Sequence, residues 1–120
     1  MPRTTTDTSL TVVRGDSLHE DLVQWELRVD GTAVDLTGYS ARLVVATKNG
    51  DELLAVDTDG SAEARLTISG TKVIPDVGPA LTSELTPGTH LYDVEVTSPS
   101  GVVTTIVVAG KFKVVADVAT

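Results

Sequence analysis

The strongest pattern in the chain is a strict alternation of apolar and polar residues between positions 23 and 29. Its apolar members are Val23, Trp25, Leu27 and Val29. Successive side chains of a β-strand point to opposite faces, so a period of two predicts a strand with one buried face. Asp30-Gly31 follows at once, and this dipeptide is typical of tight hairpin turns. We therefore expect a half-buried strand that reverses direction at Gly31.

The last third of the chain repeats this pattern. From Tyr92 to Thr97 the apolar residues again take every second position, and Ser98-Pro99-Ser100-Gly101 then favours a turn. A second apolar run covers 102–109 and ends at Gly110, after which apolar residues alternate with lysines up to Val114. We expect three consecutive strands here, separated by the turn at 98–101 and by a break at Gly110.

Shorter segments of the same kind complete the pattern. We expect strands at 10–14, 41–46, 53–56 and 64–69. Asn49-Gly50 is the hairpin signal between the second and third of these strands. Prolines interrupt residues 72–87, which therefore hold at most one helical turn, at 80–85. Turn signals recur about every eight to twelve residues, as in a sandwich. The sequence thus predicts a single all-β domain, an immunoglobulin-like antiparallel β-sandwich over 8–120, after a flexible arm at 1–7.

Three aromatic residues are candidates for the centre of this sandwich. Trp25, Tyr92 and Phe112 each lie on the apolar side of a predicted strand, so we expect them in the core. Residues 85–92, Leu-Thr-Pro-Gly-Thr-His-Leu-Tyr, resemble a tyrosine corner, in which the tyrosine hydroxyl bonds to the backbone just upstream. Replacing Tyr92 with phenylalanine is then expected to remove one hydrogen bond.

Composition and charge narrow the range of functions. The chain has 120 residues, no cysteine and a net charge of −8. Without cysteine there is neither a disulfide framework nor a thiolate metal site. A negative surface repels phosphate backbones and anionic lipid, so we expect no nucleic-acid or membrane partner. No segment has the length of a membrane span or the apolar core of a signal peptide, which predicts a soluble protein made in a cytoplasm.

Several short motifs have a possible chemical meaning, and each has a simpler structural one. Arg14-Gly15-Asp16 matches an adhesion tripeptide but is also ordinary turn chemistry, and Asp57-Thr-Asp-Gly60 lacks the later bidentate acid of a calcium loop. His19 and His90 have no adjacent nucleophile motif. We therefore expect no catalytic, metal-binding or cofactor-binding residues.

One segment is unusual for a monomer. Val102–Ala109 is apolar or threonine at every position, so both faces of the predicted strand are apolar. A strand of a sandwich normally presents one face to water, and a second apolar face is covered by a loop or by another subunit. We expect a contact between copies of the chain that includes Val103, Thr105 and Val107.

Four segments in order resemble a family of phage virion structural proteins, the immunoglobulin-like domains found at the N-terminus of baseplate upper proteins and in short tail or head accessory proteins. The segments are 13–18 (Val-Arg-Gly-Asp-Ser-Leu), 31–43 (with Val-Asp-Leu-Thr-Gly, and Ala33 where proline is common), 85–96 and 101–114. Together they span nearly the whole chain.

The resemblance implies a non-enzymatic bacteriophage subunit of the tail, baseplate, connector or capsid surface. Its partners would be copies of itself and other virion proteins, and its location would be the virion, with the host cytoplasm during assembly. The length suits a standalone subunit better than a baseplate protein with a long C-terminal arm. Three alternatives remain open: an adhesin-like module that binds a host receptor or glycan, a small hydrolase, and an accessory domain of a larger protein.

Overall fold

The computed structural model describes residues 9–18, 23–60 and 64–116. In this part the chain is almost entirely β-structure, and its described helix is the single turn α1 (Pro79–Thr82). The strands are β1 (Leu10–Val13), β2 (Trp25–Glu26), β3 (Arg28–Val29), β4 (Thr32–Ala33), β5 (Ser40–Ala46), β6 (Glu52–Asp57), β7 (Ala64–Ser69), β8 (Lys72–Val77), β9 (Gly88–Thr97) and β10 (Val103–Val115). The arm expected at 1–7 lies outside the described residues.

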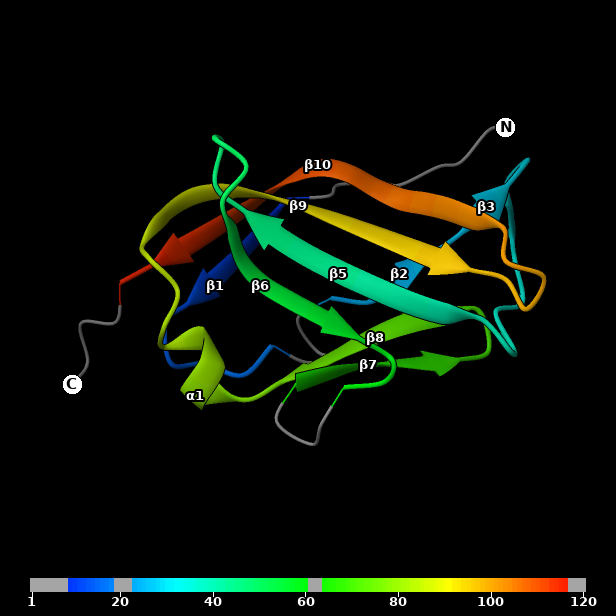
Figure 1. Cartoon of the computed structure of the whole chain (residues 1–120), viewed down its shortest axis with the longest axis horizontal. Coiled ribbons are helices and arrows are strands. Elements are labelled where there is room, and N and C mark those ends of the chain that lie inside the picture. Colours follow the sequence, from blue (N-terminus) through cyan, green and yellow to red (C-terminus); the bar gives the residue numbers. More distant parts are fainter. Residues whose placement is uncertain (1–8, 19–22, 61–63, 117–120) are drawn as a thin grey trace.

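Two sheets pack face to face, with β3 and β4 forming a separate small hairpin (Figure 1). The larger sheet has the order β1-β10-β9-β5-β6, and the smaller has the order β2-β8-β7. In immunoglobulin domains strands B, E and D form one sheet and G, F, C and C′ the other. The observed orders match this arrangement, so the fold is an immunoglobulin-like β-sandwich. One pair is not antiparallel, because β1 runs parallel to β10.

Three aromatic rings join the two sheets at the centre. The Trp25 ring lies 6.0 Å from that of Tyr92, and the Tyr92 ring meets Phe112 edge-on at 5.8 Å. The indole Nε1 of Trp25 donates to the Tyr92 hydroxyl at 3.4 Å. All three residues are buried, where the sequence places them. Antibody domains link their B and F strands by a disulfide. Here β2 and β9 occupy those places, and this aromatic cluster connects them.

The strand expected at 23–29 is divided into β2 and β3. Trp25 pairs with Val73 of β8, whereas Arg28 pairs with Ala33 of the β3–β4 hairpin. The chain therefore changes partners at Leu27, which is itself buried. The turn at Asp30-Gly31 is confirmed, since both residues have positive φ, 53° and 82°.

The break expected at Gly110 is wrong, because β10 continues through it to Val115. A Cβ atom at Gly110 would lie 2.6 Å from Cε1 of Tyr92 and 2.8 Å from Cγ1 of Val107. The glycine therefore leaves room for the tyrosine ring and does not end the strand. The last third of the chain is consequently one hairpin of two strands, closed by the expected turn, in which the Gly101 N–H donates to the Ser98 carbonyl at 2.9 Å.

Candidate functional site: the outer face of the five-stranded sheet

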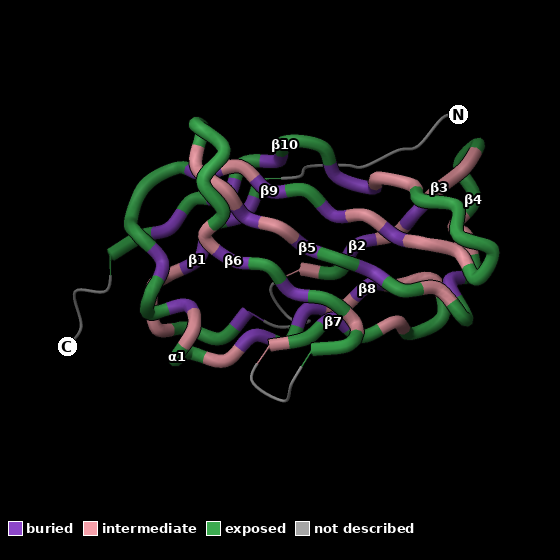
Figure 2. The backbone as a smooth tube through the Cα atoms, viewed as in Figure 1, coloured by how far each residue is buried: buried purple, intermediate pink, exposed green. Residues whose placement is uncertain are grey.

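The apolar residues that β10 exposes differ from those expected. Thr105 pairs with Glu95 and Val107 with Val94, so Ile106 is an extra residue that bulges the strand. Val107 is consequently 1% exposed and lies in the core, whereas Val103 is 56% and Val108 59% exposed. Ile106 and Val107 of β10 are both buried, whereas buried and less buried residues alternate along most of β9; Figure 2 colours both strands by burial. The predicted set of Val103, Thr105 and Val107 therefore does not share one face, and Val108 takes the place of Val107.

A second irregularity holds Val108 outward. Ala109 has φ +50°, a left-handed conformation that an alanine adopts only at a cost of about 1–2 kcal/mol. Its N–H donates to Oδ1 of Asp93 on β9 at 2.6 Å. This hydrogen bond satisfies the amide that the register shift removes from the ladder. Bulges of this kind re-aim side chains and are frequent next to functional sites.

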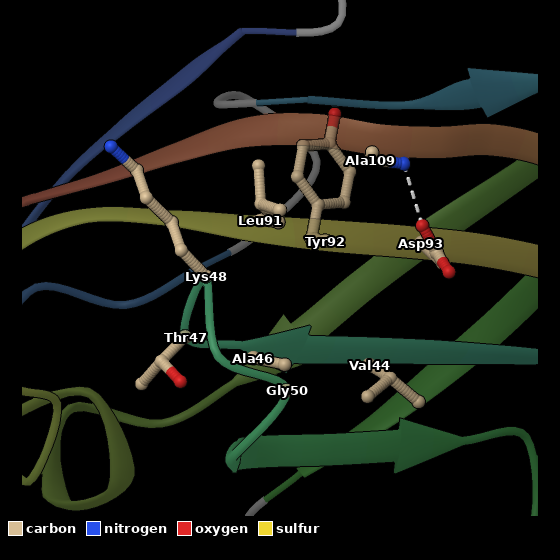
Figure 3. A pocket seen from close by; sticks show the side chains of 9 residues that line it. All are labelled: Val44, Ala46, Thr47, Lys48, Gly50, Leu91, Tyr92, Asp93 and Ala109. Atoms are coloured by element: carbon tan, nitrogen blue, oxygen red, sulfur yellow. Dashed lines mark hydrogen bonds between the residues drawn. The ribbon is translucent and has the colours of Figure 1, made fainter.

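A shallow hollow lies beside the bulge on the same face of the sheet (Figure 3). Its volume is about 240 Å³, and its lining residues are Val44, Ala46, Thr47, Lys48, Gly50, Leu91, Tyr92, Asp93 and Ala109. The turn between β5 and β6 forms one side, and β9 and β10 form the other. Figure 3 shows Lys48 at one end and Asp93 at the opposite end, with Leu91, Tyr92, Ala46 and Ala109 between them. The hollow suits an apolar side chain from a partner.

The Arg14-Gly15-Asp16 turn is engaged within the protein. The Arg14 guanidinium donates twice to the Ser83 carbonyl, from Nε at 3.2 Å and from Nη2 at 2.8 Å. The hydroxyl of Thr82 donates to the Asp16 carbonyl at 2.7 Å. These bonds attach the turn to α1, which gives the tripeptide a structural role.

His90 also has a structural position. It is buried, and its Nε2 lies 2.7 Å from the carbonyl oxygen of Thr86. A carbonyl only accepts, so Nε2 carries the proton and donates. This bond ties the start of β9 to the segment upstream, which is the role that the sequence predicts for Tyr92. The Tyr92 hydroxyl accepts from Trp25 across the sandwich. His19 lies outside the described residues.

In the turns that begin at Asp57 and at Asp35, the aspartate side chain accepts hydrogen bonds from residues of the same turn. Oδ1 of Asp57 accepts from the N–H of Asp59 at 2.9 Å. Oδ1 of Asp35 accepts from the hydroxyl and the N–H of Thr37, at 2.7 and 3.0 Å, and these bonds lower the pKa of Asp35. The Asp35 turn directs Leu36 into the core. Over residues 9–18, 23–60 and 64–116, no group of three or more His, Asp and Glu side chains is placed to hold a metal ion.

None of the helical structure described is long and apolar enough to cross a membrane.

Comparison with known proteins adds little to this geometry. No protein-family model matches the chain, and no curated protein matches it. Among solved structures, CopC from Methylosinus trichosporium OB3b is similar over 95% of this chain and 92% of its own, with 14% identity and a TM-score of 0.48. A likeness this distant carries no functional conclusion.

Proposed function

We propose that the chain is a non-enzymatic structural subunit of a bacteriophage virion that assembles through the outer face of its five-stranded sheet. Exposed apolar side chains on β10 carry this proposal. Val103 and Val108 are each more than half exposed, and the strained Ala109 bulge holds Val108 outward. The apolar lining of the hollow, which includes Val44, Ala46 and Leu91, lies on the same face, and exposed apolar surface on one face of a small acidic domain favours a contact with another protein. The partners we propose are copies of the chain and neighbouring virion proteins.

The resemblance of four segments to phage virion proteins supports the placement in a particle. Within these segments the distinctive residues serve the fold: Leu36 and Phe112 fill the core, and Arg14 anchors a turn to α1. A subunit whose shared residues build the scaffold suits a role in packing, in the tail, baseplate, connector or capsid surface.

Burial of the aromatic residues favours assembly over glycan binding. The chain has four aromatic residues. Trp25, Tyr92 and Phe112 are buried, and Tyr39 is half-buried against the core. Glycan sites stack sugars on exposed aromatic faces, whereas here three of the four rings are buried and the fourth is partly covered.

Two measurements test the proposal. Light scattering of the purified protein between about 1 and 100 µM should show self-association, which Val108→Asp should reduce. Thr67→Asp, at an exposed position on β7 of the other sheet, is the matched control and should leave association unchanged. Gold-labelled antibody against the chain should mark phage particles of the source organism in electron micrographs. Unlabelled particles in lysates that contain the protein would contradict the virion role.

A further inference from the structure

Charged side chains divide the outer face of the five-stranded sheet into two ends. Tyr92, Val94 and Val96 point into the core, so Asp93 and Glu95 between them point outward. By the same alternation, Phe112 and Val114 point inward and leave Lys111 and Lys113 on the outer face.

The pairing register separates these charges along the strands. Glu95 pairs with Thr105, near the 98–101 turn, while Lys111 pairs with Leu91 and Lys113 with Thr89, toward the opposite end. Arg42 pairs with Glu95 on one side and with Asp57 on the other, so these three residues lie in one row across the sheet. Lys48 borders the hollow, which Leu91 also lines.

One end of the face is therefore acidic, the other is basic, and the hollow lies between them. The acidic end carries Asp57, Asp93 and Glu95, and the basic end carries Lys48, Lys111 and Lys113. Arg42 and Glu52 interrupt the two groups, but their side chains lie 3.8 Å apart and offset each other.

From this pattern we infer that the partner of the outer face is a second copy of the chain, packed face to face about a two-fold axis that crosses the strands at the hollow. This inference deepens the proposed function and rests on its self-association. Such an axis brings the acidic end of each copy over the basic end of the other. A two-fold contact uses the same patch on both copies, so the complementarity must lie within one face, as it does here.

The balanced charge of the outer face contrasts with the net negative charge of the whole chain. With a net charge of −8, two copies repel each other in most orientations. On the outer face three carboxylates are matched by three lysines, so contacts made there meet less of this repulsion. Complementary charge selects the orientation, and the apolar side chains supply most of the affinity.

The size of the face is sufficient for a stable dimer. Five strands at a spacing of about 4.8 Å, and the nine steps of about 3.4 Å between the ten residues of β9, give a face of roughly 24 by 31 Å. Two such faces bury on the order of 1,500 Å² together, within the range of specific protein interfaces. Val108 precedes Ala109, which lines the hollow, so the two-fold axis places Val108 of each copy at the β10 edge of the other copy's hollow.

Charge exchange tests the orientation. Lys111→Glu and Glu95→Lys each place like charges together twice in the dimer, and each should weaken self-association at least about tenfold in sedimentation equilibrium at low salt. The double variant K111E/E95K should recover wild-type association to within about threefold, and a mixture of the two single variants should form a heterodimer. Arg65→Glu, a charge reversal on β7 of the other sheet, should change association less than about twofold. Melting temperatures near that of wild type establish that each variant folds.

The outcomes separate this contact from the proposed function. Self-association that survives both single charge reversals, or a double variant that remains weak, overturns the two-fold contact and leaves the proposed assembly role in place. A wild-type chain that stays monomeric at 100 µM but labels phage particles also overturns the two-fold contact alone. A monomer that labels no particle overturns both.

Discussion

Substitution of Gly110 by alanine tests how the core is organised. Alanine normally stabilises a glycine position that it can adopt without strain, by about 0.4–1 kcal/mol, because it restricts the unfolded chain. At Gly110 the added Cβ would lie 2.6 Å from the ring of Tyr92 and 2.8 Å from Val107. We therefore expect the opposite sign, a loss of stability.

The size of the expected loss of stability depends on which side chains must move to make room for the added Cβ atom. The Tyr92 ring cannot retreat alone, because it packs between Trp25 at 6.0 Å and Phe112 at 5.8 Å. Overpacking a well-filled core costs about 1–3 kcal/mol. After the gain from the restricted unfolded chain, a net loss of about 1–2 kcal/mol remains, equivalent to a decrease in Tm of roughly 4–8 °C for a domain of this size.

Urea denaturation followed by fluorescence provides the assay, since Trp25 is the single tryptophan of the chain and lies in the affected cluster. A second background identifies the cause. In a Tyr92→Leu protein the ring is absent, so the additional cost of Gly110→Ala should fall by at least half. A Gly110→Ala protein as stable as wild type, or a cost independent of residue 92, would refute the steric explanation.

Three further predictions concern single hydrogen bonds. Tyr92→Phe should cost about 1 kcal/mol in thermal melts, because the Trp25 indole loses its acceptor; an unchanged melt would contradict this. The pKa of Glu26 lies below its ordinary value of 4.5, first because of its hydrogen bond with Lys72, so this interaction stabilises the fold above pH 4.5 and is lost as the pH falls below it. In the Glu26→Gln protein the free energy of unfolding, measured by urea denaturation, should therefore depend less on pH in that acidic range. A dependence on pH as steep as that of wild type would show that Glu26 is not its source. Asp93→Ala removes the acceptor of the Ala109 amide and should speed hydrogen exchange at that amide at least tenfold, while Asp93→Asn, which keeps an oxygen, should change it less.

Alternation in the sequence predicts strands well wherever the ladder keeps its register. Between 92 and 97 the side chains alternate in the structure as they do in the sequence, and the turns at Asp30-Gly31 and 98–101 also form as expected. In β10 the extra residue Ile106 reverses the alternation, so Val107 points inward and Val108 outward. Two threonines precede Ile106 and two valines follow it, so the sequence offers no alternation that would reveal this reversal. Three consecutive large apolar residues followed by Ala-Gly were the available signal of a bulge.

The candidate site depends on contacts between distant parts of the chain. The hollow forms because the turn at Thr47–Gly50 lies next to Leu91 and Ala109, which are far away in sequence. Likewise, the parallel pairing of β1 with β10 joins the two ends of the described chain. Local periodicity carries no information about either contact, so the sequence predicts an apolar strand but not the surface that it forms.

Joining the two sheets by aromatic rings has a consequence for maturation. An antibody domain requires an oxidant before its cross-link exists, whereas Trp25, Tyr92 and Phe112 meet as soon as the strands do. Folding of this domain should therefore proceed at the same rate and reach the same end state in the presence of dithiothreitol. The core of this domain is therefore independent of the redox conditions in which it forms.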